Sequence, residues 1–394
     1  MSFAVFLLII LIILLLFDLY FIISFRNFIR RNNYNKVYYK ILIILSVIGI
    51  ILIAVRFTDR SYNPNLPNLT WLSFAYISLW YLPKLIIIPF FFIKDLFLTI
   101  IRLIRKRKND FLRLNKKLNK RLQIFGWILV LIPFLIVAKT EFFTSQKFIV
   151  KEVNITSSDS NFKDLKIVHI SDIHAGSLRN SSKMIEVAEI INKNLPDFIF
   201  ISGDFVNNDP NEMQNISEGI KKLKSKYGIY GILGNHDHYM TDEELEKLKH
   251  FIKNTGVDLL INENRKIKVN NTTVNIVGID DLSFGNNYGD VDKALNGIDT
   301  SFYSIMLAHN PRNWKEYNFI NRGINLTLSG HSHGGQVMFD LKFIKIIPGE
   351  MAYDENMGLY KEKGKYIYVN PGLGTTGPPI RIGIPPEITI INIK

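Results

Sequence analysis

Hydrophobic residues form long runs in the first third of the chain and short runs in the rest. Four apolar stretches approach the length at which a helix crosses a hydrocarbon core of about 30 Å, and they lie at residues 3–25, 37–55, 71–93 and 122–138. The first contains a single charge, Asp18, and the third is the least regular because Pro83 and Lys84 lie inside it. This pattern predicts a four-span α-helical transmembrane domain over residues 1–140.

Two features of these stretches have competing interpretations. The first stretch could be a cleaved signal peptide, but no positive region precedes it, the run is too long and no small-residue cleavage site follows. We therefore interpret it as a spanning helix. Lys84 is either functional, as intramembrane lysines often are, or a charge tolerated beside a proline break, and we favour the second interpretation.

After residue 139 short apolar runs alternate with polar stretches of helical period. Strands are expected at residues 166–170, 198–202, 228–233, 273–279, 304–307, 326–328, 366–369 and 388–393. Helices are expected at residues 181–194, 211–224 and 242–254. The last begins with Thr241 and has Glu244 three residues on, which is a capping box. Strand alternating with helix predicts an α/β domain with parallel pairing over residues 148–394.

Charge divides the chain in the same place. Residues 1–150 carry 21 Lys and Arg against 5 Asp and Glu, whereas residues 151–394 carry 27 against 30. The C-terminal part therefore gives no indication of a nucleic-acid partner. The basic segments 26–40 and 102–121 are expected to be cytoplasmic by the positive-inside rule. Four spans then place the C-terminal domain outside the cytoplasmic membrane.

Two further compositional features limit the interpretation. The basic segment 102–121 could also bind anionic lipid as an amphipathic surface helix, although topology alone explains it. The chain has no cysteine, so disulfides and thiolate metal sites are excluded.

Five short motifs in the C-terminal part carry most of its histidines. They are Asp172-Ile173-His174, Gly203-Asp204, Gly234-Asn235-His236-Asp237, His309-Asn310 and Gly330-His331-Ser332-His333. Imidazole, carboxylate and amide oxygen together suit zinc, manganese or iron. The ligands are too many for one ion, so the motifs point to two metals about 3.5–4 Å apart and to hydrolysis of a phosphate ester. The first three motifs each follow a predicted strand, where open α/β sheets collect functional loops.

In this order and spacing, the five motifs resemble the calcineurin-like metallophosphoesterase family, and specifically its membrane-tethered bacterial branch. The resemblance continues through Gly334-Gly335-Gln336 and residues 372–375 to Arg381 and Pro386-Glu387, and covers roughly residues 150–394. It implies a four-layer α/β/β/α sandwich, preceded here by the transmembrane domain, with a dinuclear metal centre at one edge of the sheets.

The resemblance also implies a role for each motif residue. The first of two divalent ions (manganese, zinc or iron) would be held by Asp172, His174, Asp204 and His333. The second would be held by Asn235, His309 and His331, with the Asp204 carboxylate bridging both. His236 would protonate the leaving oxygen or stabilise the developing charge, and Asp237 would orient His236.

The other three histidines have structural interpretations. His169 is expected to be a hydrogen-bonded core residue, and His250 an exposed residue on a helix. His238 lies beside the third motif, but the family pattern does not require it. We therefore expect His238, like the nearby Asp242, to be a surface residue.

A segment after the fourth predicted strand could border the site. Asp280 and Asp281 could contact substrate, but an ordinary turn is the interpretation we favour. Residues 284–289 are expected to form a flexible loop that shapes the pocket.

Three functions fit these features. The first is a multi-pass, membrane-anchored phosphoesterase acting outside the cytoplasmic membrane on a phosphodiester or pyrophosphate of the cell envelope, with lipid-linked substrates included. The second applies the same chemistry to a soluble nucleotide or cyclic nucleotide, which requires inverted topology or an odd number of spans. The third is an inactive membrane sensor or scaffold, against which the complete ligand set argues.

Overall fold

The computed structural model divides the protein into two compact units. One comprises Met1–Arg60 and Leu72–Phe142, and the other Ser61–Trp71 and Phe143–Lys394. The residues described are 3–31, 37–58, 67–104, 109–157, 162, 164–178, 180–283, 288–340 and 345–394. The limits expected for the two domains, 1–140 and 148–394, remain predictions.

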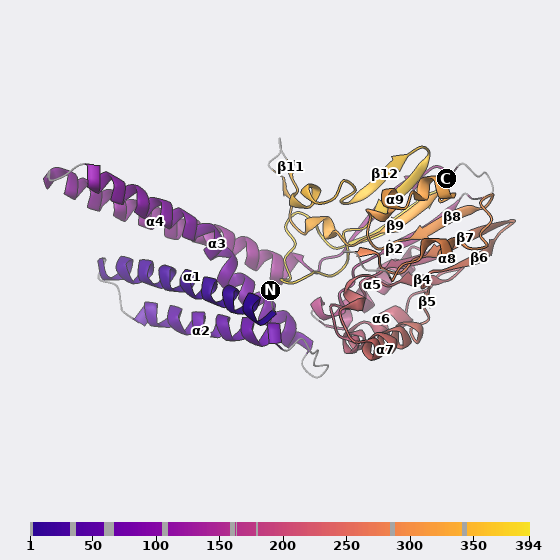
Figure 1. Cartoon of the computed structure of the whole chain (residues 1–394), viewed down its shortest axis with the longest axis horizontal. Helices are drawn as coiled ribbons and strands as arrows, with labels where there is room; N and C mark the ends of the chain where they lie inside the picture. The colour runs from indigo at the N-terminus through magenta and orange to yellow at the C-terminus, as the bar shows by residue number, and fades with distance from the viewer. Residues whose placement is uncertain are drawn as a thin grey trace. The chain divides into compact units, whose positions relative to one another are not determined.

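The first unit consists of helices (Figure 1). They are α1 (Phe3–Arg31), α2 (Val37–Thr58), α3 (Pro67–Ile104) and α4 (Asn109–Lys139), followed by a single π-helical turn, η1 (Thr140–Thr144). Among the described residues, two segments are long and apolar enough to cross a membrane, Leu8–Arg26 and Lys117–Thr144, and Lys40–Val55 is a shorter apolar helix. The four-span topology therefore remains a prediction.

Lys84 is buried inside this helical unit. It is 2% exposed, and its Nζ forms an ion pair with the carboxylate of Asp18, which is 1% exposed. The Tyr81 hydroxyl donates to the same carboxylate at 3.2 Å, and Lys84 Nζ lies 3.5 Å from the centre of the Trp80 ring. Lys84 therefore joins α3 to α1 through this ion pair. It is not merely a charge that is tolerated beside a proline break.

The described residues of the second unit form two six-stranded sheets and a small two-stranded sheet of β10 (Phe339–Asp340) and β11 (Lys345–Ile346). The first has the order β1-β14-β2-β3-β4-β5, with bounds Ile149–Ile155, Glu387–Ile393, Leu165–Ile170, Phe198–Ser202, Ile229–Ile232 and Asp258–Leu259. The second has the order β12-β13-β9-β8-β7-β6, with bounds Gly358–Glu362, Lys365–Val369, Leu326–Ser329, Tyr303–Leu307, Thr272–Gly278 and Glu263–Val269. The strands β2 to β4 are parallel to one another, as are β7 to β9, whereas β14 runs antiparallel to β2.

The helices of this unit are short. They are α5 (Ser182–Lys193), α6 (Ser217–Lys221), α7 (Asp242–Lys253), α8 (Val291–Leu295) and α9 (Asn313–Glu316). The capping box at the start of α7 is confirmed, because Thr241 and Glu244 exchange side chain to backbone hydrogen bonds. The helix expected over residues 211–224 is instead a 3₁₀ helix, η3 (Pro210–Asn215), followed by α6, with the non-helical residue Ile216 between them.

Alternation along the strands produces four layers. In β3, Phe198 and Phe200 pack between the sheets, while Ile199 and Ile201 pack on the outer face against α5, α6 and α7. Figure 1 shows these three helices gathered beside β4 and β5. The outer face of the second sheet carries its own apolar cluster, which includes Trp314 of α9. The α/β/β/α sandwich is therefore confirmed.

All eight predicted strands are present, but the four edge strands of the two six-stranded sheets were missed. One is the two-residue β5, which is too short to give a pattern, and the other three are β1, β6 and β12. Their burial patterns are mostly exposed or intermediate, and β6 begins Glu-Asn-Arg-Lys. Edge strands keep polar and charged side chains, so they lack the apolar runs on which the prediction depended.

Some predictions fall wholly or partly outside the described residues. Among them are the middle of the first basic segment at 32–36, residues 105–108 of the second, and residues 284–287 of the loop expected to shape the pocket. The rest of the second basic segment is helical, because α3 extends to Ile104 and α4 begins at Asn109.

Candidate metal centre

The five motifs meet at one edge of the two sheets. Asp172 and His174 follow β2, Asp204 follows β3, and Asn235 follows β4 in the first sheet. His309 follows β8 in the second sheet, and two further histidines, His331 and His333, follow β9. Parallel strands bring their carboxyl ends to a common edge, so segments more than 150 residues apart supply a single site.

The backbone at this edge is held in an unusual conformation. Five of the seven predicted ligands have positive φ angles between 44° and 69°, and they are Asp172, His174, Asp204, His331 and His333. Residues other than glycine rarely adopt this region, and such strain concentrates at functional sites where surrounding structure enforces it.

Two motif glycines are required by close approach. A Cβ atom at Gly234 would lie 2.3 Å from Asp204 Oδ1, and one at Gly330 would lie 2.1 Å from Asp172 Oδ2. Any side chain at either position would displace a carboxylate that faces the site. The glycines therefore belong to the motifs for steric reasons.

The residues expected at the first metal lie within contact of one another. His333 Nε2 is 3.3 Å from Asp172 Oδ1 and 3.1 Å from His174 Nε2. His174 Nε2 is also 3.5 Å from Asp204 Oδ2. Asp172, His174 and His333 can thus direct one ligand atom each toward a common point.

The residues expected at the second metal form an adjoining group. His309 Nε2 lies 3.2 Å from Asp204 Oδ2, and His331 Nδ1 lies 2.7 Å from Asn235 Oδ1. The rings of His309 and His331 are 5.0 Å apart. One oxygen of Asp204 therefore faces a histidine from each predicted set, which is the position that a bridging carboxylate needs.

The chemistry of this donor set fits cations. His309 Nε2 is buried without a hydrogen-bond partner among the described residues, although Asp204 lies close to it. The other ring nitrogen of His309, Nδ1, is 2.7 Å from the Ser202 carbonyl oxygen and therefore donates to it, which leaves Nε2 as the ligand atom. Asp172, His174 and Asp204 are all at most 1% exposed, so the cluster concentrates buried carboxylates and imidazole nitrogens that a bound cation would satisfy.

Burial also keeps most of the imidazoles neutral. It lowers the pKa of His174 and of His331 to about 3, and the neutral ring is the form that binds metal. His309 behaves differently: burial lowers its pKa, but the neighbouring Asp204 carboxylate outweighs this effect and raises the pKa to about 10. A cation at this position would take the place of that proton.

His236 and Asp237 have separate roles in the structure. The His236 ring lines the pocket, and its Nδ1 lies 2.8 Å from the Asn207 carbonyl oxygen. The buried Asp237 carboxylate accepts hydrogen bonds from the backbone amides of Gly234, Phe205 and Val206. The orienting contact expected from Asp237 to the His236 ring is thus made by Asn207, and Asp237 braces the two loops that carry the site.

A buried arginine supports the first motif from behind. The Arg381 guanidinium is 2% exposed and donates to the carbonyl oxygens of Pro371, Gly372 and Gly374. In turn, the Gly374 amide donates to the Asp172 carbonyl oxygen at 2.8 Å. Burial lowers the pKa of Arg381 to about 10, so the side chain remains a cation that clamps this loop against Asp172.

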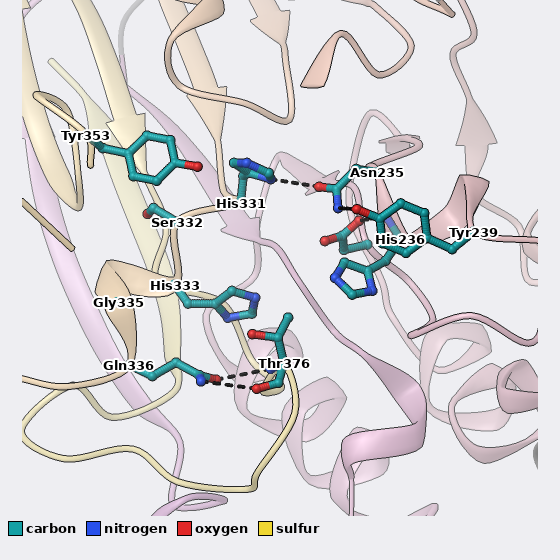
Figure 2. Close-up of a pocket in the computed structure, with 11 residues that line it drawn as sticks. Asn235, His236, Tyr239, His331, Ser332, His333, Gly335, Gln336, Tyr353 and Thr376 are labelled. Atoms are coloured by element: carbon teal, nitrogen blue, oxygen red, sulfur yellow. Dashed lines mark hydrogen bonds between the residues drawn. The ribbon is translucent and has the colours of Figure 1, made fainter. Parts of the chain in front are cut away.

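A cavity of about 330 Å³ opens onto the centre. Figure 2 shows His331, Asn235, His236 and His333 around it, and two tyrosines, Tyr239 and Tyr353, on its walls. Neither tyrosine was predicted from the sequence. Tyr239 lies two residues after the third motif, and this proximity could have identified it as a residue of the site. Tyr353 lies in an irregular segment, and no motif near it indicates such a role.

One expectation near the pocket was wrong. The His238 side chain is 3% exposed and its Nε2 lies 2.7 Å from Asp280 Oδ1, so His238 is not a surface residue. The exposed Tyr288 ring stacks on His238 with centroids 3.9 Å apart. Three other expectations are confirmed: His169 is buried and bonded to Ser202 Oγ at 2.8 Å, and both His250 and Asp242 are exposed.

Comparison with known families gives two matches, one for each part of the chain. The family model described as calcineurin-like phosphoesterase matches residues 165–335. The model described as probable calcineurin-like phosphoesterase, transmembrane domain, matches residues 2–139.

Several known proteins are similar to this chain over 59% or more of its length. The uncharacterized metallophosphoesterase YkoQ of Bacillus subtilis is 31% identical over 275 residues, which cover 68% of this chain and 97% of YkoQ. The uncharacterized metallophosphoesterase Cj0846 of Campylobacter jejuni is 33% identical over 59% of this chain and 60% of its own length. A transmembrane protein with metallophosphoesterase domain from Danio rerio is 31% identical over 62% of this chain and 56% of its own length.

Proposed function

The chain belongs to the calcineurin-like metallophosphoesterase family. We propose that it is a membrane-anchored enzyme that uses two divalent metal ions. Its substrate in this proposal is a phosphodiester or pyrophosphate of the cell envelope. The family establishes a phosphoester hydrolase with a transmembrane domain. The number of ions, the side of the membrane and the substrate are the proposal.

One observation carries the two-metal proposal. Asp204 Oδ2 lies 3.5 Å from His174 Nε2 and 3.2 Å from His309 Nε2, so a single carboxylate serves both predicted ligand sets. We assign Asp172, His174, Asp204 and His333 to one ion and Asn235, His309, His331 and the same Asp204 to the other. When bound, two such ions would acidify a water molecule and neutralise charge on the phosphoryl oxygens.

The protein supplies the proton for the leaving group through His236. A carbonyl oxygen only accepts hydrogen bonds, so His236 Nδ1 carries a hydrogen toward Asn207. Nε2 is therefore the nitrogen that faces the ester, and it can give a proton to the leaving oxygen when the ring is an imidazolium, protonated on both nitrogens. His236 lines the cavity, where it can reach a bound ester, and Asp237 holds the loop that presents it.

An envelope substrate is supported by the membrane domain and by the charge pattern. A transmembrane domain on the same chain confines the enzyme to a membrane, where lipid-linked phosphodiesters and pyrophosphates are concentrated. The cavity is lined by two tyrosines and the Gln336 side chain, which is held by the Thr376 backbone (Figure 2). A soluble nucleotide substrate remains the alternative, and topology distinguishes the two.

Substrate choice is tested with the full-length protein in lipid vesicles loaded with manganese. A lipid-linked phosphodiester or pyrophosphate is expected to be hydrolysed with kcat/KM at least about tenfold above that of a cyclic nucleotide, which corresponds to about 1.4 kcal/mol of transition-state stabilisation. Phosphate or phosphomonoester release measures both. A cyclic nucleotide preferred over every lipid-linked substrate would contradict the envelope assignment.

Membrane topology is tested with reporter fusions after Lys139. A reporter that works only outside the cytoplasm is expected to be active there, because the two basic segments hold their loops on the cytoplasmic side. A reporter that works only in the cytoplasm, fused at the same position, serves as the matched control. Activity of the cytoplasmic reporter would contradict the proposal of an envelope substrate and would favour a soluble nucleotide substrate.

A further inference from the structure

Tyr239 contacts both a proposed metal ligand, Asn235, and the proposed proton donor, His236. Its hydroxyl oxygen accepts a hydrogen bond from Asn235 Nδ2 at 2.9 Å. Its ring lies 4.8 Å from the His236 ring, with the two planes inclined at 58°. Figure 2 shows Tyr239 beside Asn235 and His236 at the wall of the cavity. One side chain therefore contacts a proposed metal ligand and the proposed proton donor.

The contact with Asn235 determines which end of the amide faces the site. A side-chain amide has an oxygen that binds cations at one end and an NH₂ group that repels them at the other. Asn235 is 3% exposed, so an NH₂ group without a partner would be costly. Tyr239 supplies that partner, and the opposite end, Oδ1, lies 2.7 Å from His331 Nδ1, where the second ion is assigned.

We propose that Tyr239 is a positioning residue that orients the Asn235 amide so that its oxygen faces the second metal, and that packs the His236 ring in place for proton transfer. The inference rests on the proposed two-metal centre. Groups that bind a ligand from behind set metal affinity together with the ligands themselves. The hydroxyl acts on metal affinity, and the ring acts on His236.

Metal titration of the full-length protein in detergent tests the hydroxyl. After chelation, manganese is added and bound metal is measured by equilibrium dialysis. The wild type is expected to bind two ions. In Tyr239→Phe the affinity for the second ion should fall by about 10- to 100-fold, while the first ion binds as before. The matched control is Tyr317→Phe, which removes a tyrosine hydroxyl from the apolar cluster on the outer face of the second sheet and should bind both ions normally.

A double variant separates orientation from general damage. A carboxylate has oxygen at both ends and needs no orienting partner, so Asn235→Asp should bind the second ion equally well with Tyr239 or with Phe at position 239. Rescue of Tyr239→Phe by Asn235→Asp therefore supports the inference, and a loss that persists in the double variant overturns it. This comparison remains informative if Tyr239→Phe lowers the melting temperature.

The remaining outcomes are also decisive. A Tyr239→Phe protein that binds both ions with wild-type affinity overturns the inference while leaving the two-metal centre intact. A wild-type protein that never binds more than one ion overturns the centre itself and the inference with it. The ring is tested by Tyr239→Leu, which should lower kcat below that of Tyr239→Phe at saturating metal, and equal kcat values would remove the role in placing His236.

Discussion

Replacing Asp204 by asparagine is expected to weaken the binding of both metal ions and to lower kcat by about 10³- to 10⁴-fold. The reason lies in the two distances from Asp204 Oδ2, 3.5 Å to His174 and 3.2 Å to His309. Asparagine keeps the shape of the side chain, but it removes the negative charge that two cations would share. Metal content of the purified full-length protein and turnover of a nitrophenyl phosphodiester measure the two effects.

The matched control for this variant is Asp242→Asn. Asp242 is exposed at the start of α7. The same replacement of a carboxylate by an amide is therefore made there, away from the cluster. It should keep wild-type metal content and turnover. The bridging assignment would be wrong if Asp204→Asn retained two ions, or if it lost one ion while the other bound with unchanged affinity.

Replacing His236 by alanine is expected to lower kcat by about 10²- to 10⁴-fold while metal content stays near that of the wild type. The Asn207 carbonyl oxygen orients the ring so that Nε2 of the imidazolium faces the chemistry, and the ring is absent from both ligand sets assigned above. The deficit should shrink for esters with good leaving groups such as nitrophenolate, because these need little protonation. Turnover across a series of leaving groups, with metal analysis of the same samples, measures this.

Two comparisons make the His236 result interpretable. His250→Ala removes an exposed histidine from α7 and should change neither turnover nor metal content. His333→Ala should lose metal and activity together, because the His333 ring lies 3.1 Å from His174 and 3.3 Å from Asp172. His236 also lies near His174 and Asp204, where it could bind a metal ion itself. The general-acid role is therefore contradicted if His236→Ala loses metal as His333→Ala does. It equally fails if the deficit is the same for good and poor leaving groups.

The order of elements around the site could be read from local patterns. The strand at Phe198–Ser202 is buried on both faces, and a strand of that kind appears in the sequence as an unbroken apolar run. The start of α7 was recognised because a capping box needs only residues three positions apart. Such features depend on burial and backbone preferences, which the sequence displays directly.

The residues gathered at the centre were identified through the five motifs. Each motif follows a strand, and parallel strands end at the same edge, so their meeting follows from the fold class once that is recognised. The edge strands β1, β6 and β12 were not visible, because exposed strands keep the polar composition of loops.

Contacts between specific side chains were decided by the tertiary structure alone. Asp18 and Lys84 pair across 66 residues, His238 is buried against Asp280, and Asp237 binds backbone amides in place of the neighbouring His236. The sequence shows that each residue is polar and near a motif or an apolar run. Which partner it meets depends on how distant strands and helices pack, and a buried polar group is stable only once that packing supplies its partner.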